Sequence, residues 1–282
     1  MKGLSLELSA EKFADFIQAR APLFVLTGAG CSTASGIPEY RDDEGEWKHS
    51  KPVQFQDFCR DQLTRQRYWA RSLLGWPRVV AAEPNDTHHA LARLEHAGFI
   101  RRLVTQNVDG LHQRAGSKNV IDLHGRLESV TCLSCTQSLS RSKVQDALRR
   151  ANPGFREKPQ ATAPDGDAVL ENFDFSTFVV YDCPRCDGIL KPDVVFFGES
   201  VPRSRVESAM RSLDDSGALL VVGSSLMVYS GYRFCKAAID KGKHLCALNR
   251  GRTRADAELD LKIEHDCAEL LTSAIALMGL DA

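Results

Sequence analysis

The sequence predicts an α/β protein built on an open parallel sheet with helices on both faces. Short apolar runs recur along the chain, and each is continuous rather than alternating, as expected for strands that are buried on both faces. Helical patterns separate several of these runs, which is the succession of an open α/β sheet. Two longer stretches, 38–84 and 126–192, interrupt the succession and indicate insertions that build a smaller domain.

The expected elements of the sheet follow one another along the chain. Ser9–Arg20 has the spacing of an amphipathic helix with Ser9 as its N-cap, and Pro22 separates it from the first strand. The expected strands are Leu23–Thr27, Ile100–Thr105, Val120–Leu123, Ala218–Gly223 and Leu245–Leu248. The helices expected between strands include Thr87–His96 and Gly231–Lys241.

The two interruptions differ in composition. Residues 38–84 are charged and aromatic, with helical spacing around Phe55–Leu74. Residues 126–192 include the segment NPGFREKPQATAPDGD at 152–167, which is rich in proline, glycine and aspartate and is expected to be a loop.

Length and charge exclude several classes of protein. A chain of 282 residues predicts one large domain or two unequal ones. The net charge of −1 argues against a nucleic-acid partner, because proteins that bind nucleic acid usually carry a basic excess. No apolar run reaches the ~18–20 residues of a membrane helix, and the N-terminus has the pattern of neither a secretory signal nor a transit peptide. We therefore expect a cytoplasmic protein, or one of the mitochondrial matrix if a transit peptide has been removed.

Four of the nine cysteines form two C-x-x-C pairs, Cys132 with Cys135 and Cys183 with Cys186. An odd cysteine count argues against a disulfide framework, and two such pairs can complete a closed tetrahedral Cys₄ site. A closed site leaves no position for water, so the pattern predicts one structural zinc ion. The 47 residues from 136 to 182 exceed the usual spacing and require an insertion to be looped out. Four reduced core thiols, or a zinc ribbon that binds nucleic acid or protein, are the alternatives.

A glycine turn follows the first expected strand. The sequence FVLTGAG places Gly28 and Gly30 after Leu23–Thr27, the position at which backbone N–H groups of a helix start meet the pyrophosphate of a dinucleotide. Thr33 stands where the full G-x-G-x-x-G fingerprint has its third glycine, and no strand ending in an acidic residue follows about 20 residues later. The pattern therefore argues against a standard dehydrogenase, and an ordinary tight turn remains the alternative.

Polar residues also follow several of the other expected strands. TQNVDG at 105–110 and LHG at 123–125 lie where α/β sheets bind ligands, and the ordinary pKa of a histidine suits His124 to general-base catalysis. A structural imidazole is the alternative for His124, and we keep that interpretation for the other histidines. Gly223-Ser224-Ser225 and Asn249-Arg250 are candidates for ribose and phosphate contacts.

These motifs, in this order, resemble those of the sirtuins, the NAD-consuming protein-lysine deacylases. The resemblance runs from about Leu23 to Leu271 and rests on GAGCSTASGIPEYR, TQNVDGLH, LHG, the two C-x-x-C pairs, VVFFGE, GSSL and LNRG. The stretches RQRYWAR, APDGD, KPDVVFFGE and VYSGYRF are similar to the class II branch that contains mitochondrial sirtuin four.

The resemblance implies a Rossmann-type domain at 1–37, 85–125 and 193–282, a helical insertion and cofactor loop at 38–84, and a zinc-binding small domain at 126–192. NAD is expected in the cleft between the large and small domains. The implied NAD-binding residues are Gly28, Ala29, Gly30, Ser32, Glu39, Tyr40, Arg41, Gln106, Asn107, Asp109, Gly223, Ser224, Ser225, Asn249, Arg250 and Cys267. Glu39 replaces the aspartate more usual in this loop.

The implied reaction begins when the acyl oxygen of an acyl-lysine attacks C1′ of the nicotinamide ribose and nicotinamide leaves. His124 then acts as general base on a ribose hydroxyl, which attacks the acyl carbon, with Asn107 and Asp109 as further catalytic residues. Water completes the step and gives free lysine and O-acyl-ADP-ribose. The same NAD site would serve protein mono-ADP-ribosyl transfer, which is the alternative activity.

The implied substrate contacts lie in the two insertions and after them. The backbone of an acyl-lysine protein is expected to add as a strand between Val195-Phe196-Phe197-Gly198 and the segment 228–231. Tyr68 and Arg71 share a helix face at i and i+3, and sirtuins that remove acidic acyl groups carry a similar pair that clamps the distal carboxylate. A surface arginine beside a core tyrosine is the alternative for this pair.

Overall fold

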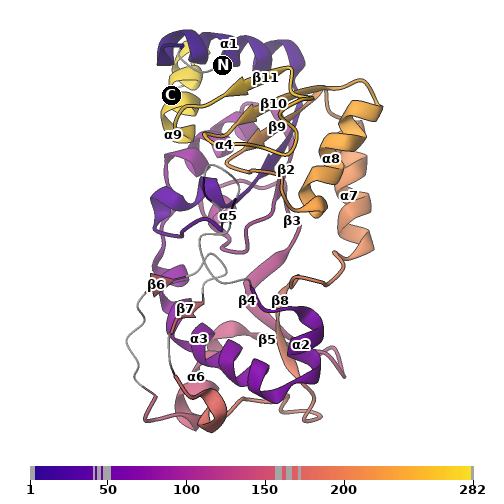
Figure 1. The fold of residues 1–282 in the computed structure, drawn as a ribbon. Coiled ribbons are helices and arrows are strands. Elements are labelled where there is room, and N and C mark those ends of the chain that lie inside the picture. Colours follow the sequence, from indigo (N-terminus) through magenta and orange to yellow (C-terminus); the bar gives the residue numbers. More distant parts are fainter. Residues whose placement is uncertain are drawn as a thin grey trace. The chain divides into compact units, whose positions relative to one another are not determined.

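The computed structural model describes residues 4–40, 42, 46, 52–155, 161–162, 167–170 and 173–280. The chain forms two compact units (Figure 1). The larger unit comprises residues 1–48, 83–123 and 201–282, and the smaller unit comprises residues 49–82 and 124–200.

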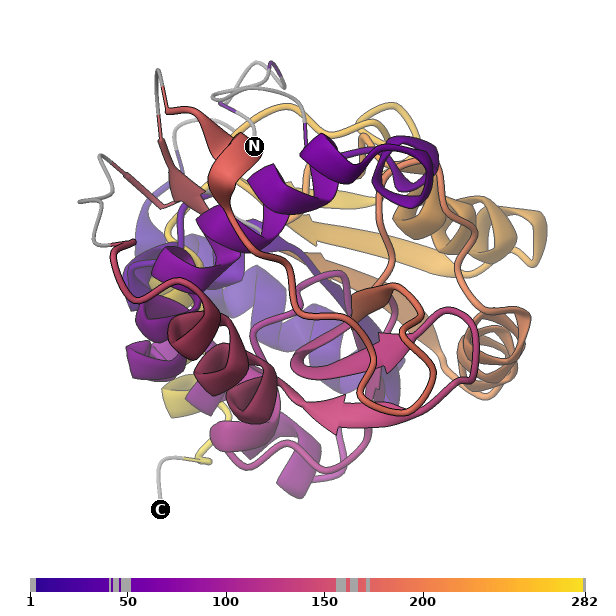
Figure 2. The same ribbon diagram turned by 90° about the horizontal axis from the view of Figure 1, so that it is seen from below.

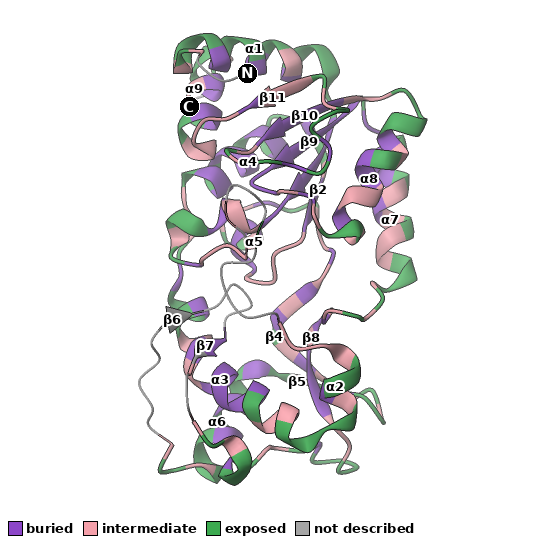
Figure 3. Cartoon of the chain, in the orientation of Figure 1, coloured by how far each residue is buried: buried purple, intermediate pink, exposed green. Residues whose placement is uncertain are grey.

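The larger unit is built on a six-stranded, all-parallel sheet with the order β11-β10-β9-β1-β2-β3. Its strands are β1 (Leu23–Thr27), β2 (Ile100–Thr105), β3 (Val120–Asp122), β9 (Ala218–Val222), β10 (His244–Leu248) and β11 (Leu261–Ile263). The parallel sheet confirms the predicted fold class, and β11 is the one of these strands that the apolar pattern missed. Figure 3 shows the central strands coloured as buried, which agrees with their continuous apolar sequences.

Helices cover both faces of this sheet, because side chains alternate along each strand. Leu23 and Val25 of β1 pack with residues of α1 (Leu6–Arg20), α4 (Asp86–His96) and α9 (Cys267–Leu277). Phe24 and Leu26 pack on the other face with residues of α7 (Arg203–Asp214) and α8 (Tyr229–Asp240). In Figure 1 and in the turned view of Figure 2, α7 and α8 lie on the other side of the sheet from α9. Short helices follow β1 and β2, namely η1 (Ala29–Cys31), η2 (Thr33–Ser35) and α5 (Leu111–Arg114).

The first helix begins earlier than the sequence predicts. Ser5, not Ser9, is its N-cap, since the Ser5 hydroxyl accepts the Leu8 N–H at 3.3 Å. Ser9 lies one turn inside the helix and is buried, and its own N–H donates to the Ser5 carbonyl at 3.1 Å. Two serines four residues apart offered the same N-cap signal, and the first of them is the cap.

The smaller unit combines helices with a three-stranded antiparallel sheet of order β5-β4-β8. Its elements are α2 (Phe55–Arg60), α3 (Gln62–Ala81), β4 (Gly125–Cys132), β5 (Ser138–Ser140), α6 (Arg141–Ala151), β6 (Ala161–Thr162), β7 (Ala168–Val169), η3 (Phe175–Thr177) and β8 (Leu190–Val194). The helical spacing around Phe55–Leu74 belongs to two helices, because the Asp61 carboxylate accepts the Thr64 N–H at 2.7 Å and starts a new one.

The segment 152–167 is not entirely a loop. Residues 161–162 pair with 168–169 as a two-stranded ladder, whereas 156–160 and 163–166 lie outside the described residues.

Among the helices that the structure describes, none has both the length and the apolar character to cross a membrane.

Candidate functional site

The four predicted metal ligands gather at one point of the smaller unit. Their Sγ atoms all lie within 4.8 Å of one another, with Cys132 3.6 Å from Cys186 and Cys135 3.7 Å from Cys183. A tetrahedral zinc ion with Zn–S bonds of ~2.3 Å separates its sulfur ligands by about 3.8 Å. The cluster therefore fits one zinc ion in a closed Cys₄ site.

Each cysteine pair lies in a tight turn of the same kind. The Thr136 N–H donates to the Cys132 carbonyl at 3.0 Å, and the Asp187 N–H donates to the Cys183 carbonyl at 2.9 Å. Thr136 and Asp187 both have left-handed backbones, with φ of 59° and 55°. A Cβ on Gly188 would lie 2.9 Å from the Cys132 sulfur, so only glycine lets the second turn approach the first.

Backbone donors favour the ionised form of Cys132. The N–H of Cys135 points at the Cys132 sulfur at 3.5 Å and that of Ser134 at 3.4 Å. These donors, that of Cys135 foremost, lower the pKa of Cys132 to about 6. A thiolate is the form that binds a metal ion.

In the larger unit, three glycines bring two strand ends into contact. The Gly28 N–H donates to the Val222 carbonyl at 3.1 Å, and the Gly30 N–H donates to the Gly223 carbonyl at 2.9 Å. A Cβ on Gly28 would lie 2.7 Å from Ser224 Cβ, and one on Gly30 would lie 2.9 Å from Gly223 Cα. Gly223 itself has φ of +59°, in the left-handed region. Larger residues would push the turn after β1 away from the turn after β9.

Predicted polar residues meet at this turn in one hydrogen-bonded network. The Asn107 amide donates to the Gly28 carbonyl at 3.0 Å and to the Ser32 hydroxyl at 3.1 Å, and Ser32 donates to Asp109 at 2.7 Å. The Gln106 amide donates to the Ser224 hydroxyl at 2.8 Å. The topology therefore brings together residues from the ends of β1, β2 and β9.

Asp109 is the buried acid of this network. Its second oxygen accepts the Leu111 N–H at 2.9 Å. Burial raises the pKa of Asp109, whereas the hydrogen bonds from Leu111 and Ser32 lower it. The carboxylate is held in one orientation, and in its ionised form it accepts hydrogen bonds only.

Two histidines lie behind this network, and the sequence analysis assigned both to structural roles. His88 Nδ1 accepts the Asn85 N–H at 3.3 Å, which leaves Nε2 to donate to Ser32 at 3.5 Å. Burial lowers the pKa of His88 to about 4, so the ring is neutral at physiological pH. His112 Nε2 lies 2.9 Å from the Thr27 hydroxyl, and the two imidazole rings are 4.7 Å apart. Asn85-x-x-His88 has the spacing of a helix-capping box, but only the tertiary fold places His88 against Ser32 and His112 against Thr27.

The residues assigned to the adenosine end follow β10 and begin α9. The Asn249 N–H donates to the Ile263 carbonyl at 3.1 Å, and the Gly223 N–H donates to the Leu248 carbonyl at 2.9 Å. The exposed Arg250 pairs with Asp266 at 3.0 Å, next to Cys267. Burial raises the pKa of the Cys267 thiol to about 12, so Cys267 is not a nucleophile.

The remaining predicted NAD-binding residues are less well defined. Ala29 lies in η1, and Ser225 is half-buried with its carbonyl accepting the Arg254 N–H at 2.8 Å. Glu39 and Tyr40 are half-buried after η2, and Arg41 lies outside the described residues.

The predicted general base belongs to the smaller unit. His124 is half-buried in the turn before β4, and its carbonyl accepts the Val195 N–H at 2.8 Å. The next residue, Gly125, pairs with Val194 and has φ of +82°, and a Cβ there would lie 1.9 Å from the Asp193 carbonyl oxygen. One end of the β4–β8 ladder thus holds His124 beside the predicted substrate strand.

The predicted substrate segment 195–198 is braced along one side. Its Phe197 carbonyl accepts the Phe55 N–H at 2.8 Å, and its Gly198 carbonyl accepts the Gln56 amide at 3.0 Å. Among the residues that the structure describes, the Val195 carbonyl and the Gly198 N–H have no hydrogen-bond partner. These two backbone groups are available to an added strand.

Tyr68 and Arg71 are both buried on α3, so Arg71 is not a surface arginine. The Tyr68 ring lies 5.2 Å from that of Phe196, in the substrate segment. Arg71 Nε donates to the Ala168 carbonyl at 2.8 Å. In the described part of the chain its two terminal nitrogens have no acceptor.

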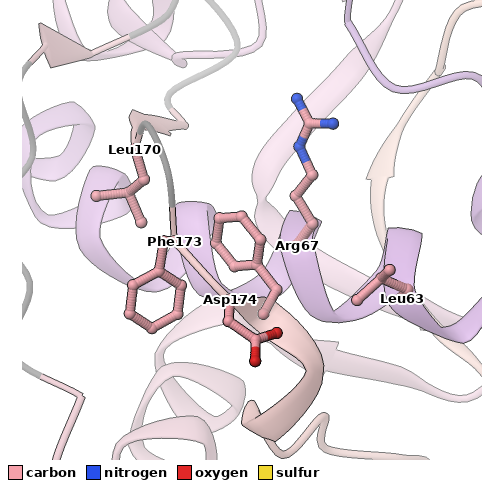
Figure 4. Close-up of a pocket in the computed structure, with 6 residues that line it drawn as sticks. Leu63, Arg67, Leu170, Phe173 and Asp174 are labelled. Atoms are coloured by element: carbon pink, nitrogen blue, oxygen red, sulfur yellow. The ribbon is translucent and has the colours of Figure 1, made fainter.

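A pocket of about 420 Å³ opens elsewhere on the smaller unit (Figure 4). It is lined by Leu63, Arg67, Leu170, Phe173, Asp174 and Phe175. The Asp174 carboxylate accepts the Ser176 N–H at 2.9 Å, and the Arg67 side chain in Figure 4 points away from it. None of the residues predicted for NAD, zinc or substrate lines this pocket.

Comparison with known proteins agrees with these features. The family model of the Sir2 family matches residues 28–230. An "NAD-dependent protein deacetylase" of Xanthomonas campestris pv. campestris (strain 8004) is 59% identical over 257 residues, which cover 91% of this chain and 88% of the relative. An "NAD-dependent protein deacetylase 2" of Bradyrhizobium diazoefficiens is 56% identical over 264 residues, which cover 94% and 97%.

Solved structures give the same result. The complex "Sir2-p53 peptide-NAD+" superposes with a TM-score of 0.78 at 29% identity and covers 96% of this chain and 99% of that one. "Sir2 bound to acetylated peptide" superposes with a TM-score of 0.77 at 30% identity and the same coverage.

Proposed function

Because this chain belongs to the Sir2 family, we propose that it is an NAD-dependent protein deacetylase that moves the acyl group from lysine to ADP-ribose and releases nicotinamide. The observation that carries the proposal is the network of Ser32, Asn107 and Asp109 at the glycine turn. The chain covers 88% and 97% of the length of the two relatives, which supports the same activity for it. A zinc ribbon with only a binding role would not require this network.

The larger unit offers the residues that would hold NAD. The Gly28 and Gly30 N–H groups already donate to Val222 and Gly223, so the Ala29 N–H is the donor of this turn that would meet the pyrophosphate. Asp109 suits the carboxamide NH₂ of nicotinamide because its carboxylate accepts hydrogen bonds. NAD supplies the ribose carbon that receives the acyl oxygen, with nicotinamide as the leaving group.

His124 would act on the substrate side of the reaction. A neutral imidazole can remove the proton of a ribose hydroxyl, which then attacks the acyl carbon. The hydrogen bond from Val195 to the His124 carbonyl supports this role, because it ties the base to the strand that would hold the acyl-lysine. The free groups of Val195 and Gly198 would pair with the backbone of the substrate.

The four cysteines would hold a structural zinc ion. Cys132 ends β4, Cys135 lies in the turn after it, and Cys183 and Cys186 precede β8. The metal would therefore join the far end of the ladder that starts at Gly125, next to His124. We assign it no step of the reaction, because a Cys₄ site is closed to water and substrate.

We further propose that the enzyme belongs to the class II, sirtuin-four-like branch and accepts acidic acyl groups. The support is Arg71, whose buried guanidinium retains two terminal nitrogens without a described acceptor. A carboxylate at the end of an acyl chain would make two charge-assisted hydrogen bonds with such a group.

The bacterial sources of the relatives support the cytoplasm as the compartment.

A product analysis tests the proposed function. The purified protein is incubated with NAD and a lysine-peptide panel that carries acetyl, glutaryl and long neutral acyl groups, and products are identified by mass spectrometry. We expect deacylated peptide, nicotinamide and O-acyl-ADP-ribose in equal amounts. Peptide or protein that gains ADP-ribose, without O-acyl-ADP-ribose, would instead identify a mono-ADP-ribosyltransferase.

A further inference from the structure

The turn between β9 and α8 contains a residue with a strained backbone. Leu226 has φ of +58°, in the left-handed region that L-residues other than glycine rarely adopt. Its side chain is buried in the core that covers one face of the sheet. The chain turns at this residue from Ser225, a predicted NAD contact, towards the segment 228–231, which is predicted to flank the substrate strand. Such a conformation persists only where the surrounding structure holds it.

Arg254, in the loop after β10, binds the carbonyls of the two residues that flank Leu226. Its backbone N–H donates to the Ser225 carbonyl at 2.8 Å, and its Nη1 donates to the Met227 carbonyl at 3.3 Å. One residue therefore holds the strained turn on both of its sides, once through the main chain and once through the guanidinium group.

The same guanidinium group covers the first turn of α8. Its Cζ lies 4.6 Å from the centre of the Tyr232 ring and 5.9 Å from that of Tyr229. A cation over an aromatic face is attracted by the negative charge of that face. Arg254 is exposed, yet one carbonyl and two rings hold its side chain against the start of the helix.

The contact with Met227 also sets the orientation of one peptide group. The Met227–Val228 peptide is trans, so the Met227 carbonyl and the Val228 N–H point in opposite directions. Because the carbonyl points at Arg254, the Val228 N–H points away from it. Among the residues that the structure describes, this N–H has no hydrogen-bond partner, whereas the Val228 carbonyl accepts the N–H groups of Gly231 and Tyr232 at 3.1 and 3.2 Å. The segment thus begins with a backbone donor that an extended peptide can use.

From these contacts we propose that Arg254 is a positioning residue that fixes the segment 228–231 for the strand that carries the acyl-lysine. It acts through the segment and not on the reacting atoms. Without the guanidinium group the strained turn relaxes, and part of the binding free energy of the substrate is then used to order the segment. This inference rests on the proposed function and adds a residue that aligns its substrate.

The test compares three variants with the wild type. Arg254→Met removes the guanidinium group but keeps the N–H that binds Ser225, Arg254→Lys keeps a cation, and Arg252→Met removes an exposed arginine of the same loop as a matched control. Binding of an acetyl-lysine peptide is measured by fluorescence polarisation and binding of NAD by calorimetry, alongside both KM values, kcat and the melting temperature. Hydrogen exchange measured by mass spectrometry follows the amides of residues 226–232.

We expect Arg254→Met to weaken peptide binding about 10-fold, as for loss of a charged hydrogen bond and its ring contacts at an exposed site. The dissociation constant for NAD, kcat at saturating peptide and the melting temperature should stay close to those of the wild type. The amides of residues 226–232 should exchange faster in this variant alone. Arg254→Lys should recover most of the peptide affinity, and Arg252→Met should match the wild type throughout.

Unchanged peptide affinity in Arg254→Met would overturn the proposal. Equal losses of peptide and NAD affinity with a lower melting temperature would also overturn it and make Arg254 a stabilising residue. If Arg254→Met does not fold, Arg254→Lys and Arg254→Gln decide, since both can donate to Met227 and only lysine keeps the charge; equal peptide affinities would then reject the proposal. Binding is measured without turnover, so a wild type that binds the peptide through Arg254 but does not deacetylate it would reject the proposed function alone.

Discussion

In the larger unit the predicted NAD-binding residues follow strands of a six-stranded buried sheet, whereas in the smaller unit His124 and the segment 195–198 flank a sheet of only three strands. The first sheet has an extensive apolar core on each face. The second is joined at its far end by the cysteine cluster, because Cys132 pairs with Leu190 where Gly125 pairs with Val194 at the near end. The larger unit is therefore held by packing, and we expect the smaller unit to depend in addition on the zinc ion that its cysteine cluster would bind.

Removal of one metal ligand should give the largest difference in stability between the two units. Cys132→Ala should lose its zinc, and since structural zinc contributes ~10–16 kcal/mol of apparent binding free energy, β4 and β8 should unfold. Hydrogen exchange measured by mass spectrometry should show lost protection in β4 and β8 and retained protection in β1 and β9. Cys59→Ala, a cysteine of the same unit outside the cluster, is the control. Full protection of β4 in zinc-free Cys132→Ala would show that the smaller unit does not need zinc for its stability.

A methyl group at Gly223 should disrupt the turn at which the larger unit would bind NAD. Ala at φ of +59° is strained, and its Cβ would lie 2.6 Å from the Cys31 nitrogen, so we expect a loss of about 2–4 kcal/mol in stability and a loss of NAD binding. Gly242→Ala is the control, because Gly242 has φ of +66° and no atom within 4 Å of the added Cβ. It should cost only ~1–2 kcal/mol and leave NAD affinity unchanged. Equal effects of the two substitutions by calorimetry would show that close approach at Gly223 is unimportant.

Arg71→Met should change selectivity without unfolding the smaller unit. Loss of one charged hydrogen bond in a desolvated pocket costs roughly 1.5–3 kcal/mol, so kcat/KM for a glutaryl-lysine peptide should fall ~10–150-fold. The value for a long neutral acyl chain should change little, and Arg67→Met on the exposed face of the same helix should change neither. Equal losses of kcat/KM on acidic and neutral substrates would show that Arg71 stabilises the fold and does not recognise the acyl group.

Asp109→Asn should have the smallest effect on stability. Because the carboxylate is buried, we expect the variant to be more stable than the wild type at neutral pH. Because burial raises the pKa of Asp109, the folded state binds the proton more tightly than the unfolded state, and this group costs stability as pH rises through its folded pKa. The substituted amide carries no charge, so the variant should lose this dependence and melt higher than the wild type at neutral pH, although NAD binding weakens. A melting temperature that falls equally at pH 4 and pH 8 would show that the hydrogen bonds of Asp109 outweigh its desolvation.

The sequence predicts the larger unit better than the smaller one for a physical reason. Parallel strands buried on both faces appear as continuous apolar runs, and β1 and β2 have the predicted bounds. β4 has an interrupted pattern of buried and half-buried residues and pairs with β8 across 57 intervening residues, 133–189, so no local pattern indicates the pair. Motifs identified the cysteine cluster and the network at Asp109, but His88, His112 and Arg254 became visible only through tertiary contacts.

We propose that residues of the larger unit bind NAD and that His124, a residue of the smaller unit, is the base that acts on the ribose. One experiment with His124→Tyr tests it directly, by calorimetric titration with NAD and by assay of acetyl-lysine peptide turnover on the same sample. We predict a dissociation constant for NAD close to that of the wild type and a fall of ~10²-fold or more in deacetylation. Unchanged turnover in the folded variant would contradict the account.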